Sequence, residues 1–442
     1  MIFLNLSQTI HRLADRIDRD PIATGSILPV GIVSEEEMRA ISDSLDIYRG
    51  AAPWLKNGNC GLSLASGIAA ELARLTLTEF SCKFSENPSG RLLSKSLASF
   101  FSHLRVYTEY ACASGGVMFK PFFSGSVLSA ECLLPSRFIP LETDGTGKII
   151  SCAFIYTLKK GNRFYTRIEE HRRENDGYAI TNRAFVSDRG FGFGKETGLS
   201  DIQEWTSLSP SVWIKNLKSP LFAYFAIPLG NCFSPHSPLG IPVFRRAEGL
   251  IREADLQFGR LIWEFEGGEL AVDASEDAFR IGKNGKPELP PGKERLYRSN
   301  ALDACCSSNE LLSTFSPALR DKSLINGLNR IVMFIEDACG IARGTFSDPS
   351  EIARTATEVR SMRQKTYSTV CDIQSSLKSA LYEFIGAAGT LASLYSLTYG
   401  KASAEIRFGD GVLTDTESDR AAEREDVKCG ILSPEEFRER WY

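Results

Sequence analysis

Residues 243–269, VFRRAEGLIREADLQFGRLIWEFEGGE, give the clearest structural signal in the sequence. Apolar residues recur every three or four positions, which is typical of an amphipathic helix. The pair Gly267-Gly268 marks its end, because glycine is common just beyond a helix C-terminus. The pattern predicts one long helix over 243–268. Glu248 precedes Arg252 by four residues, the spacing of an ion pair along a helix.

A second long helix is predicted over 321–340, with Gly340 suited to its C-terminal end. Between the two helices, residues 269–320 are polar and interrupted by glycine and proline, which indicates a small projecting hairpin-like module. After the second helix comes a loop, and then Asp348-Pro349-Ser350-Glu351, a capping sequence that predicts a third long helix. The order is therefore helix, module, helix, loop, helix.

The regions before and after this helix–module–helix–loop–helix segment differ in the secondary structure that they predict. Residues 1–116 read as helical, with a capping box at Ser34 to Glu37 and further helices at 62–78 and 92–113. Residues 117–228 contain short runs rich in aromatic and β-branched residues, separated by turn clusters, which predicts antiparallel strands. A Pro- and Gly-rich boundary follows at 228–242, and near the C-terminus come a strand at 405–408 and a helix capped by Ser433. The fold class expected is α+β.

Composition narrows the function classes. The chain has 442 residues with 51 Lys+Arg against 55 Asp+Glu, a net charge of −4. This balance excludes a generic basic nucleic-acid coat but allows transient contact with DNA. Eleven cysteines without a CxxC spacing indicate reduced thiols. The uncharged run 384–400 is shorter than the ~20 apolar residues of a membrane span, so we expect a soluble protein made inside a cell.

Enzyme motifs are mostly absent from the sequence. The four histidines, at 11, 103, 171 and 236, lie too far apart for HExxH or a histidine metal cluster, and we expect no metal and no cofactor. The glycine-rich loop 189–195 fails as a phosphate loop because Glu196, not Ser or Thr, follows its lysine. Glu169-Glu170-His171 could form an acid–base site, but alternation along a strand favours charges that face solvent.

Basic residues gather around the third helix, with few acids nearby. They are Arg343, Arg354, Arg360, Arg363 and Lys365, and the acids considered are Asp348, Glu351 and Glu358. They form either a solvated helix face or a phosphate-facing element, and the second interpretation gains weight if many copies surround one axis. The sequence also does not decide what covers the apolar stripes of the two long helices. They bury either between copies in a closed ring or against the chain's own β-domain.

Several stretches, taken together and in order, resemble the portal proteins of tailed bacteriophages, in particular the siphovirus-like kind of phages of Gram-positive hosts. They are IYRG at 47–50 with Trp54, then 62–79, 109–123, FYTRIEEH at 164–171, YAITNRAF at 178–185, 219–269, 340–370 and 427–442. They span nearly the whole chain.

The resemblance implies a dodecameric ring at one capsid vertex, through which double-stranded viral DNA is packaged and ejected. It also implies these parts: a wing at 1–242, stem helices at 243–268 and 321–342, a clip at 269–320, a tunnel loop at 343–352, a channel helix at 353–385, and a short crown and tail at 386–442. The expected location is the virion, with assembly in the host cytoplasm and no contact with a membrane. A short crown leaves crown-dependent contacts in question.

The resemblance also implies site residues and partners. The DNA-channel or tunnel-loop candidates are Arg343, Thr345, Phe346, Ser347, Asp348, Arg354, Arg360 and Lys365. The clip candidates for contact with the terminase large subunit or a head–tail adaptor are Lys283, Lys286, Glu288, Lys293 and Arg295. Major capsid and scaffolding proteins are further expected partners. Portals have no catalytic residues, and the missing Walker motif agrees with that because ATP hydrolysis belongs to the terminase.

Two other classes stay open from the sequence. One is a minor capsid or head–tail connector protein bound to a portal, although such a protein would rarely need this length. The other is a monomeric enzyme with a site in the β-rich domain around Glu169, Glu170 and His171.

Overall fold

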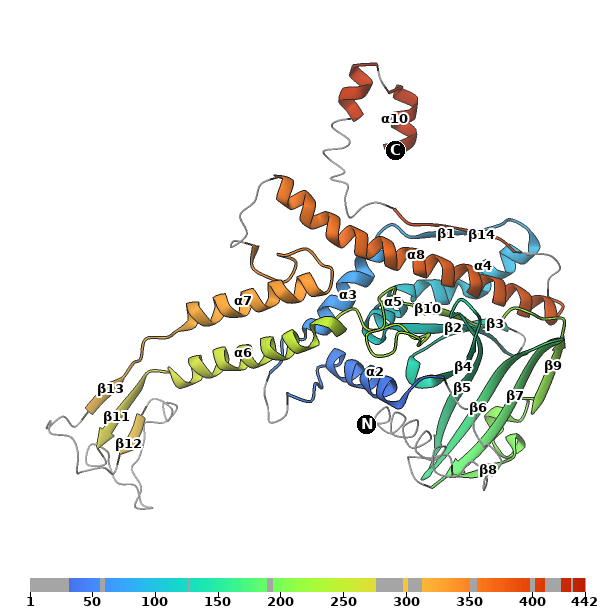
Figure 1. Ribbon diagram of the computed structural model, residues 1–442, viewed down its shortest axis with the longest axis horizontal. Helices are drawn as coiled ribbons and strands as arrows, with labels where there is room; N and C mark the ends of the chain where they lie inside the picture. The colour runs from blue at the N-terminus through green and yellow to red at the C-terminus, as the bar shows by residue number, and fades with distance from the viewer. Residues whose placement is uncertain are drawn as a thin grey trace.

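In the computed structural model, two long helices project as an arm from a body of helices and sheets (Figure 1). The residues that it describes are 32–55, 60–125, 127–188, 194–275, 297–300, 312–349, 356–397, 402–409, 423–430 and 432–441. Helices and antiparallel sheets both contribute to the body, which confirms the α+β class. No helix within these ranges has the length and apolar content needed to cross a bilayer.

Four helices form the N-terminal part of the body: α2 (Glu35–Tyr48), α3 (Leu64–Thr76), α4 (Pro88–Ser102) and α5 (Leu104–Ser114). Ser34 caps α2 as predicted, because its side chain accepts a hydrogen bond from the Glu37 backbone N–H at 3.3 Å. The single helix predicted over 92–113 is wrong. The chain divides at His103, where the side chains of Ser102 and His103 both bond the Ser99 carbonyl, at 2.7 and 2.8 Å, and compete with the helical ladder.

Two antiparallel sheets form the β-rich part and confirm the prediction for 117–228. The smaller sheet has the order β10-β2-β3, from β2 (Gly116–Ser124), β3 (Val127–Leu133) and β10 (Ala223–Ala226). The larger sheet runs β4-β5-β6-β7, with β8 and β9 both pairing with β7. Its strands are β4 (Phe138–Thr143), β5 (Ile149–Lys160), β6 (Arg163–Glu174), β7 (Gly177–Ser187), β8 (Lys195–Thr197) and β9 (Ser211–Lys215). Short 3₁₀ turns at Pro135–Arg137, Leu199–Asp201 and Gln203–Trp205 connect or flank these strands.

The long helix α8 (Ala356–Leu394) lies across the body and joins its helices to the smaller sheet (Figure 1). Its apolar face enters the main core, which includes Leu72, Leu97, Phe119, Leu377 and Phe384. Phe384 packs on Phe100 with ring centroids 4.4 Å apart. The helix continues nine residues beyond the predicted end at 385. Ser350 and Glu351 of the predicted cap lie outside the described residues.

The C-terminal elements agree with the sequence. Strand β14 (Ala404–Arg407) forms where a strand was predicted and pairs antiparallel with β1 (Ser81–Phe84). Helix α10 (Pro434–Trp441) begins at the predicted cap. There the Ser433 hydroxyl accepts from the Glu436 N–H, and the Glu436 carboxylate accepts from the Ser433 N–H, each at 3.2 Å.

The arm consists of α6 (Glu248–Gly267) and α7 (Asp321–Ala338), with three short strands at its far end (Figure 1). Helix α6 begins five residues later than predicted, because Arg245–Ala247 form a 3₁₀ turn after Pro242. The side chain of Arg245, in that turn, forms an ion pair with the carboxylate of Glu248, the first residue of α6. The ion pair between Glu248 and Arg252 expected from their spacing is therefore wrong. Gly340 closes α7 as predicted, with a φ of 73° that favours glycine.

The module at the far end is a mixed sheet and not the expected hairpin. Strand β11 (Ala271–Ser275) lies in the centre, antiparallel to β13 (Leu312–Phe315) and parallel to β12 (Tyr297–Asn300). Next to this sheet, an ion pair joins the end of α6 to the start of α7. The carboxylate of Glu264 accepts from Arg320 at 2.7 Å and from the Arg320 backbone N–H at 3.1 Å. These bonds hold the pKa of Glu264 at about 2.

The apolar stripes of the arm helices end in two different environments. Near the body, Ile251, Ala254 and Ile335 are buried in the main core. Farther out, Trp263 is 66% exposed and Ile325 is 46% exposed. The root of the arm therefore packs against the chain's own body, whereas the far half leaves large apolar side chains exposed.

Candidate functional sites: the loop after α7 and a buried charged cluster

The loop that follows α7 is organised by Glu336, which is fully buried. One carboxylate oxygen accepts from the backbone N–H groups of Phe346 and Ser347, at 2.6 and 3.0 Å. The other accepts from the Gly344 N–H at 3.2 Å and the Ser347 hydroxyl at 2.7 Å. Four donors around one buried carboxylate satisfy it fully and fix the backbone that supplies them. Residues 344–347 therefore have a defined conformation.

Three further contacts tie the loop to its neighbours. The Ala342 N–H donates to the Thr366 hydroxyl of α8 at 2.8 Å, and the Asp348 N–H donates to the Asn329 side chain of α7 at 2.7 Å. The ring of Phe346 rests on α3 at Gly67, where a Cβ atom would lie 3.2 Å from the ring. The loop is thus held between α7, α8 and α3.

Asp337 places two of the predicted basic residues together. Its carboxylate accepts from Arg343 Nη2 at 2.5 Å and Nε at 2.9 Å, and from Lys365 Nζ at 3.2 Å. Lys365 also donates to the Asp337 carbonyl at 2.8 Å. Partial burial opposes ionisation of Asp337, but the two cations outweigh it and lower its pKa. Sequence reasoning considered only acids after Arg343 and missed this one, which the turn at Gly340 brings back to the cations.

Of the eight predicted channel or tunnel-loop residues, one is buried and two lie wholly or partly outside the described residues. Arg343, Thr345, Phe346 and Asp348 are exposed, whereas Ser347 is buried against Glu336 and cannot face a ligand. Arg354 lies outside the described residues, and Arg360 lies in α8 with its side chain outside them. The clip candidates Lys283, Lys286, Glu288, Lys293 and Arg295 also lie outside the described residues.

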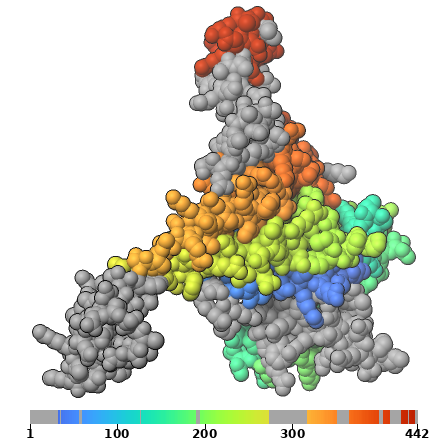
Figure 2. All heavy atoms as spheres, turned by 60° about the vertical axis from the view of Figure 1, so that its left-hand side comes forward, coloured from blue at the N-terminus to red at the C-terminus, as the bar shows by residue number. Residues whose placement is uncertain are grey.

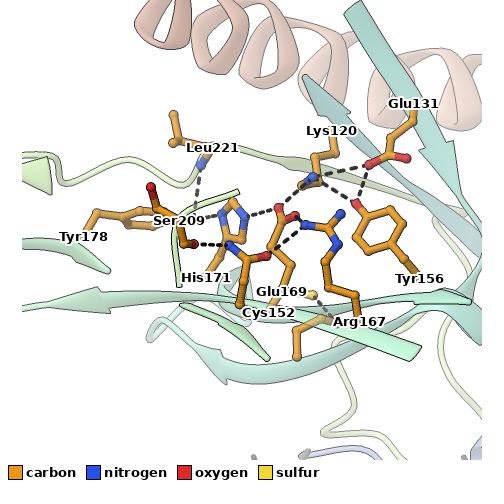
Figure 3. Close-up of polar contacts among 12 residues, drawn as sticks. Lys120, Glu131, Cys152, Tyr156, Arg167, Glu169, His171, Tyr178, Ser209 and Leu221 are labelled. Carbon is orange, nitrogen blue, oxygen red and sulfur yellow. Dashed lines mark hydrogen bonds and ion pairs between the residues drawn. The ribbon is translucent and has the colours of Figure 1, made fainter. Parts of the chain in front are cut away.

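A second polar site lies between the two sheets of the body (Figure 3). The prediction that Glu169 and His171 face solvent is wrong, since their residues are only 9% and 3% exposed. Along β6 the side chains do alternate: Glu170 points the other way and pairs with Arg172 at 2.6 Å. Glu169 and His171 lie on the inward face of β6, which packs against Lys120 of β2 in the smaller sheet. Periodicity shows that the two faces of a strand differ, but not which face a second sheet covers.

The cluster is balanced in charge. Lys120 Nζ lies 2.8 Å from Glu169 Oε1, 2.9 Å from the Tyr156 hydroxyl and 3.3 Å from Glu131 Oε1. Arg167 Nη1 lies 2.6 Å from Glu169 Oε2. Two cations and two carboxylates therefore compensate one another in a site that excludes most water.

A chain of hydrogen bonds fixes the histidine. The Leu221 N–H lies 3.3 Å from the Tyr178 hydroxyl, which lies 3.2 Å from His171 Nδ1, and His171 Nε2 lies 2.8 Å from Glu169. Burial lowers the pKa of His171 more than Glu169 raises it, so the ring is neutral. Tyr178 then donates to Nδ1, and the proton on Nε2 is donated to the carboxylate.

The protonation states make this cluster a structural link. Burial disfavours the Lys120 ammonium and the Glu169 carboxylate, but their partners outweigh it, raising the pKa of Lys120 and lowering that of Glu169. A charged lysine is no nucleophile, and an ionised, fully engaged carboxylate is no acid near neutral pH. The arrangement therefore favours a clamp between the sheets over the acid–base site considered from the sequence.

Metal chemistry has no evident site in the described part of the chain. No group of three or more His, Cys, Asp or Glu side chains there is arranged to hold a metal ion.

Comparisons with known proteins add little. No protein-family model matches the sequence, and no curated protein matches it. Among solved structures, the chain is similar to a chain described as "Neck of native GTA particle computed with C12 symmetry". The alignment covers 94% of this chain and 96% of that one, with a TM-score of 0.43 and 12% sequence identity. A similarity this distant does not establish a common fold.

Proposed function

We propose that this chain is the subunit of a portal-type ring, the conduit for DNA at one vertex of a phage capsid. In this proposal the body is the wing, α6 and α7 are the stem, the strands at their far end belong to the clip, and α8 lies beside the channel. Residues 343–349 are the described part of the tunnel loop predicted over 343–352. The proposal combines the sequence resemblance with one observation of the structure, the exposed far half of the arm.

The far half of the arm exposes more apolar surface than an isolated helix pair tolerates well. Its large exposed side chains are Ile262, Trp263, Phe265, Ile325 and, just beyond the helices, Leu270 and Leu319. Several large apolar side chains exposed on one segment are typical of an interaction site. Ile262 and Trp263 are adjacent in the sequence, so they project about 100° apart around α6. The apolar surface therefore faces more than one direction.

Exposure in more than one direction favours a ring over a pair. A two-fold dimer uses one self-complementary patch on each subunit, whereas a head-to-tail contact uses two different surfaces and closes into a ring. A subunit with neighbours on both sides would bury the far half of the arm on both flanks. The dodecamer, the packaging and ejection roles, and docking of the terminase and a head–tail adaptor at the clip are parts of the proposal that come from the resemblance.

Assembly of the purified chain tests the proposal. We expect native mass spectrometry and negative-stain imaging, with capsid and scaffolding proteins present, to give annular particles of about twelve times the 48.8 kDa chain. Trp263→Glu should abolish the rings. Trp213→Glu is the matched control, because Trp213 is 49% exposed but lies on β9 of the body. A chain that stays monomeric with all partners present would contradict the proposal.

A minor capsid or connector protein bound to a portal is the second candidate. It would give a discrete complex with a portal ring without forming a ring itself, and the same images would distinguish it.

A further inference from the structure

The ion pairs around Asp337 have a consequence for contact with DNA. Arg343 and Lys365 are two of the four cations of this region expected to meet phosphate, and both are engaged by the same carboxylate. The three side chains remain accessible, with 42%, 45% and 34% of the side-chain surface of Arg343, Lys365 and Asp337 exposed. The site is therefore a surface site whose cations already have an anionic partner.

The charge around these cations favours binding of an anion such as phosphate. Arg330 lies seven residues before Asp337 on α7, which is about two helical turns, so it projects on the same side of the helix. It is exposed. Arg343 and Lys365 thus carry two positive charges against the one carboxylate of Asp337, while the neighbouring Glu336 is buried and engaged by the loop backbone. The local excess of positive charge attracts an anion.

We propose that Asp337 is a built-in competitor of DNA phosphate for Arg343 and Lys365. A phosphate can bind the Arg343 guanidinium through its Nε and Nη2 only by displacing the Asp337 carboxylate that occupies them. The inference rests on the proposed function, in which DNA moves past this loop. Competition from Asp337 keeps the affinity of each subunit for the DNA phosphates low.

Weak contact matters because identical sites around a ring add up. Each neutralised phosphate contributes to a salt-dependent affinity, and linked sites multiply their effects. A ring that presented two free cations per subunit would hold DNA firmly and oppose its movement. One carboxylate per subunit counteracts this without removing the positive charge that attracts DNA at longer range.

The loop does not depend on this carboxylate for its conformation. Glu336, Thr366 and Asn329 hold the loop backbone, and Lys365 also bonds the Asp337 carbonyl, which any substitution of the side chain preserves. Asp337→Asn should therefore release the cations and leave the loop in place. Thermal unfolding of the variant checks this.

The test measures binding of the full-length protein to a fluorescently labelled 30-base-pair duplex by anisotropy over a range of salt concentrations. For Asp337→Asn we expect about a tenfold gain in affinity at low salt, with a salt slope steeper by about 0.9 for each phosphate gained. Asp43→Asn is the matched control, since it removes the same charge from an exposed position on α2 of the body. It should change affinity far less. Equal gains in the two variants would overturn the inference.

A second pair of variants keeps the inference testable if Asp337→Asn unfolds. Arg343→Gln with Lys365→Gln should leave the salt slope of DNA binding nearly unchanged, because in the wild-type protein both cations pair with Asp337 and not with phosphate. A slope shallower by about 0.9 for each cation removed would show that the cations contact phosphate in the wild-type protein, and would contradict the inference. Adding these two changes to Asp337→Asn should remove its gain.

The outcome is separable from that of the proposed function. Rings that form normally while Asp337→Asn leaves DNA affinity unchanged would refute the competitor and leave the conduit intact. A protein that stays monomeric, and in which Asp337→Asn still raises DNA affinity, would refute the conduit and support the competitor.

Discussion

The root and the far half of the arm belong to the same two helices but differ in how their apolar residues are satisfied. At the root, Ile335 is 1% exposed and packs into the body's main core. In the far half, Trp263 is two-thirds exposed and Ile325 nearly half. Both regions show the same amphipathic pattern in the sequence. The difference teaches that an amphipathic stripe says how much surface must be buried, but not whether the partner belongs to the same chain.

The largest effect is expected in the body, which should be stable without any second copy. Lys120→Met would remove the cation that Glu169 and Glu131 share and leave a buried carboxylate undercompensated. We expect a loss of about 3–5 kcal/mol in the free energy of unfolding, as for other broken buried ion pairs. Chemical denaturation of the monomer measures it. Lys95→Met, at an exposed lysine on α4, is the control, and equal small losses in the two variants would mean that the cluster does not clamp the sheets.

A pair of adjacent residues sharpens the comparison at the root of the arm. Ile335→Ala should cost about 2–4 kcal/mol, because it leaves a cavity in the main core. Phe334→Ala should change the monomer's stability by less than about 0.5 kcal/mol, because Phe334 is 52% exposed. Denaturant unfolding of both variants provides the measurement. Similar losses would show that the root is not part of the body's core.

The smallest effect is expected at the ion pair of the far half. Arg320 holds the pKa of Glu264 at about 2, below the ordinary 4.5, so ionisation of Glu264 stabilises the folded state above about pH 4.5. This contribution is lost as the pH falls from 4.5 towards 2. Glu264→Gln should therefore unfold at slightly lower denaturant than wild type at pH 7, and the two should converge near pH 2. Glu266→Gln, at an exposed position two residues on, is expected to show no such convergence.

Local signals in the sequence predicted the elements of the fold well. Periodicity located the arm helices, runs of aromatic and β-branched residues located β2, β5, β6, β7 and β10, and Ser34, Gly340 and Ser433 marked helix ends where the structure has them. The break at His103 escaped prediction because it depends on side chains that bond the Ser99 carbonyl, within an otherwise continuous apolar pattern. Local capping chemistry is readable in a sequence, whereas competition for one carbonyl is not.

The candidate sites were harder to predict because they depend on contacts between distant elements. Alternation along β6 correctly separates Glu170 from Glu169 and His171, but only the packing of a second sheet reveals which face is inside. Likewise, Asp337 meets Arg343 and Lys365 only after the chain reverses at Gly340. The cations were visible in the sequence, and their anion was not.

The most direct test of the account is the accessibility of Trp263 in the assembled particle. Hydroxyl-radical footprinting with mass spectrometry would compare oxidation of Trp263 and Trp213 in the monomer and in the assembly. The account predicts that Trp263 is oxidised readily in the monomer and strongly protected in the ring, because neighbouring copies cover the far half of the arm. Oxidation of Trp263 to the same extent in both states would contradict it.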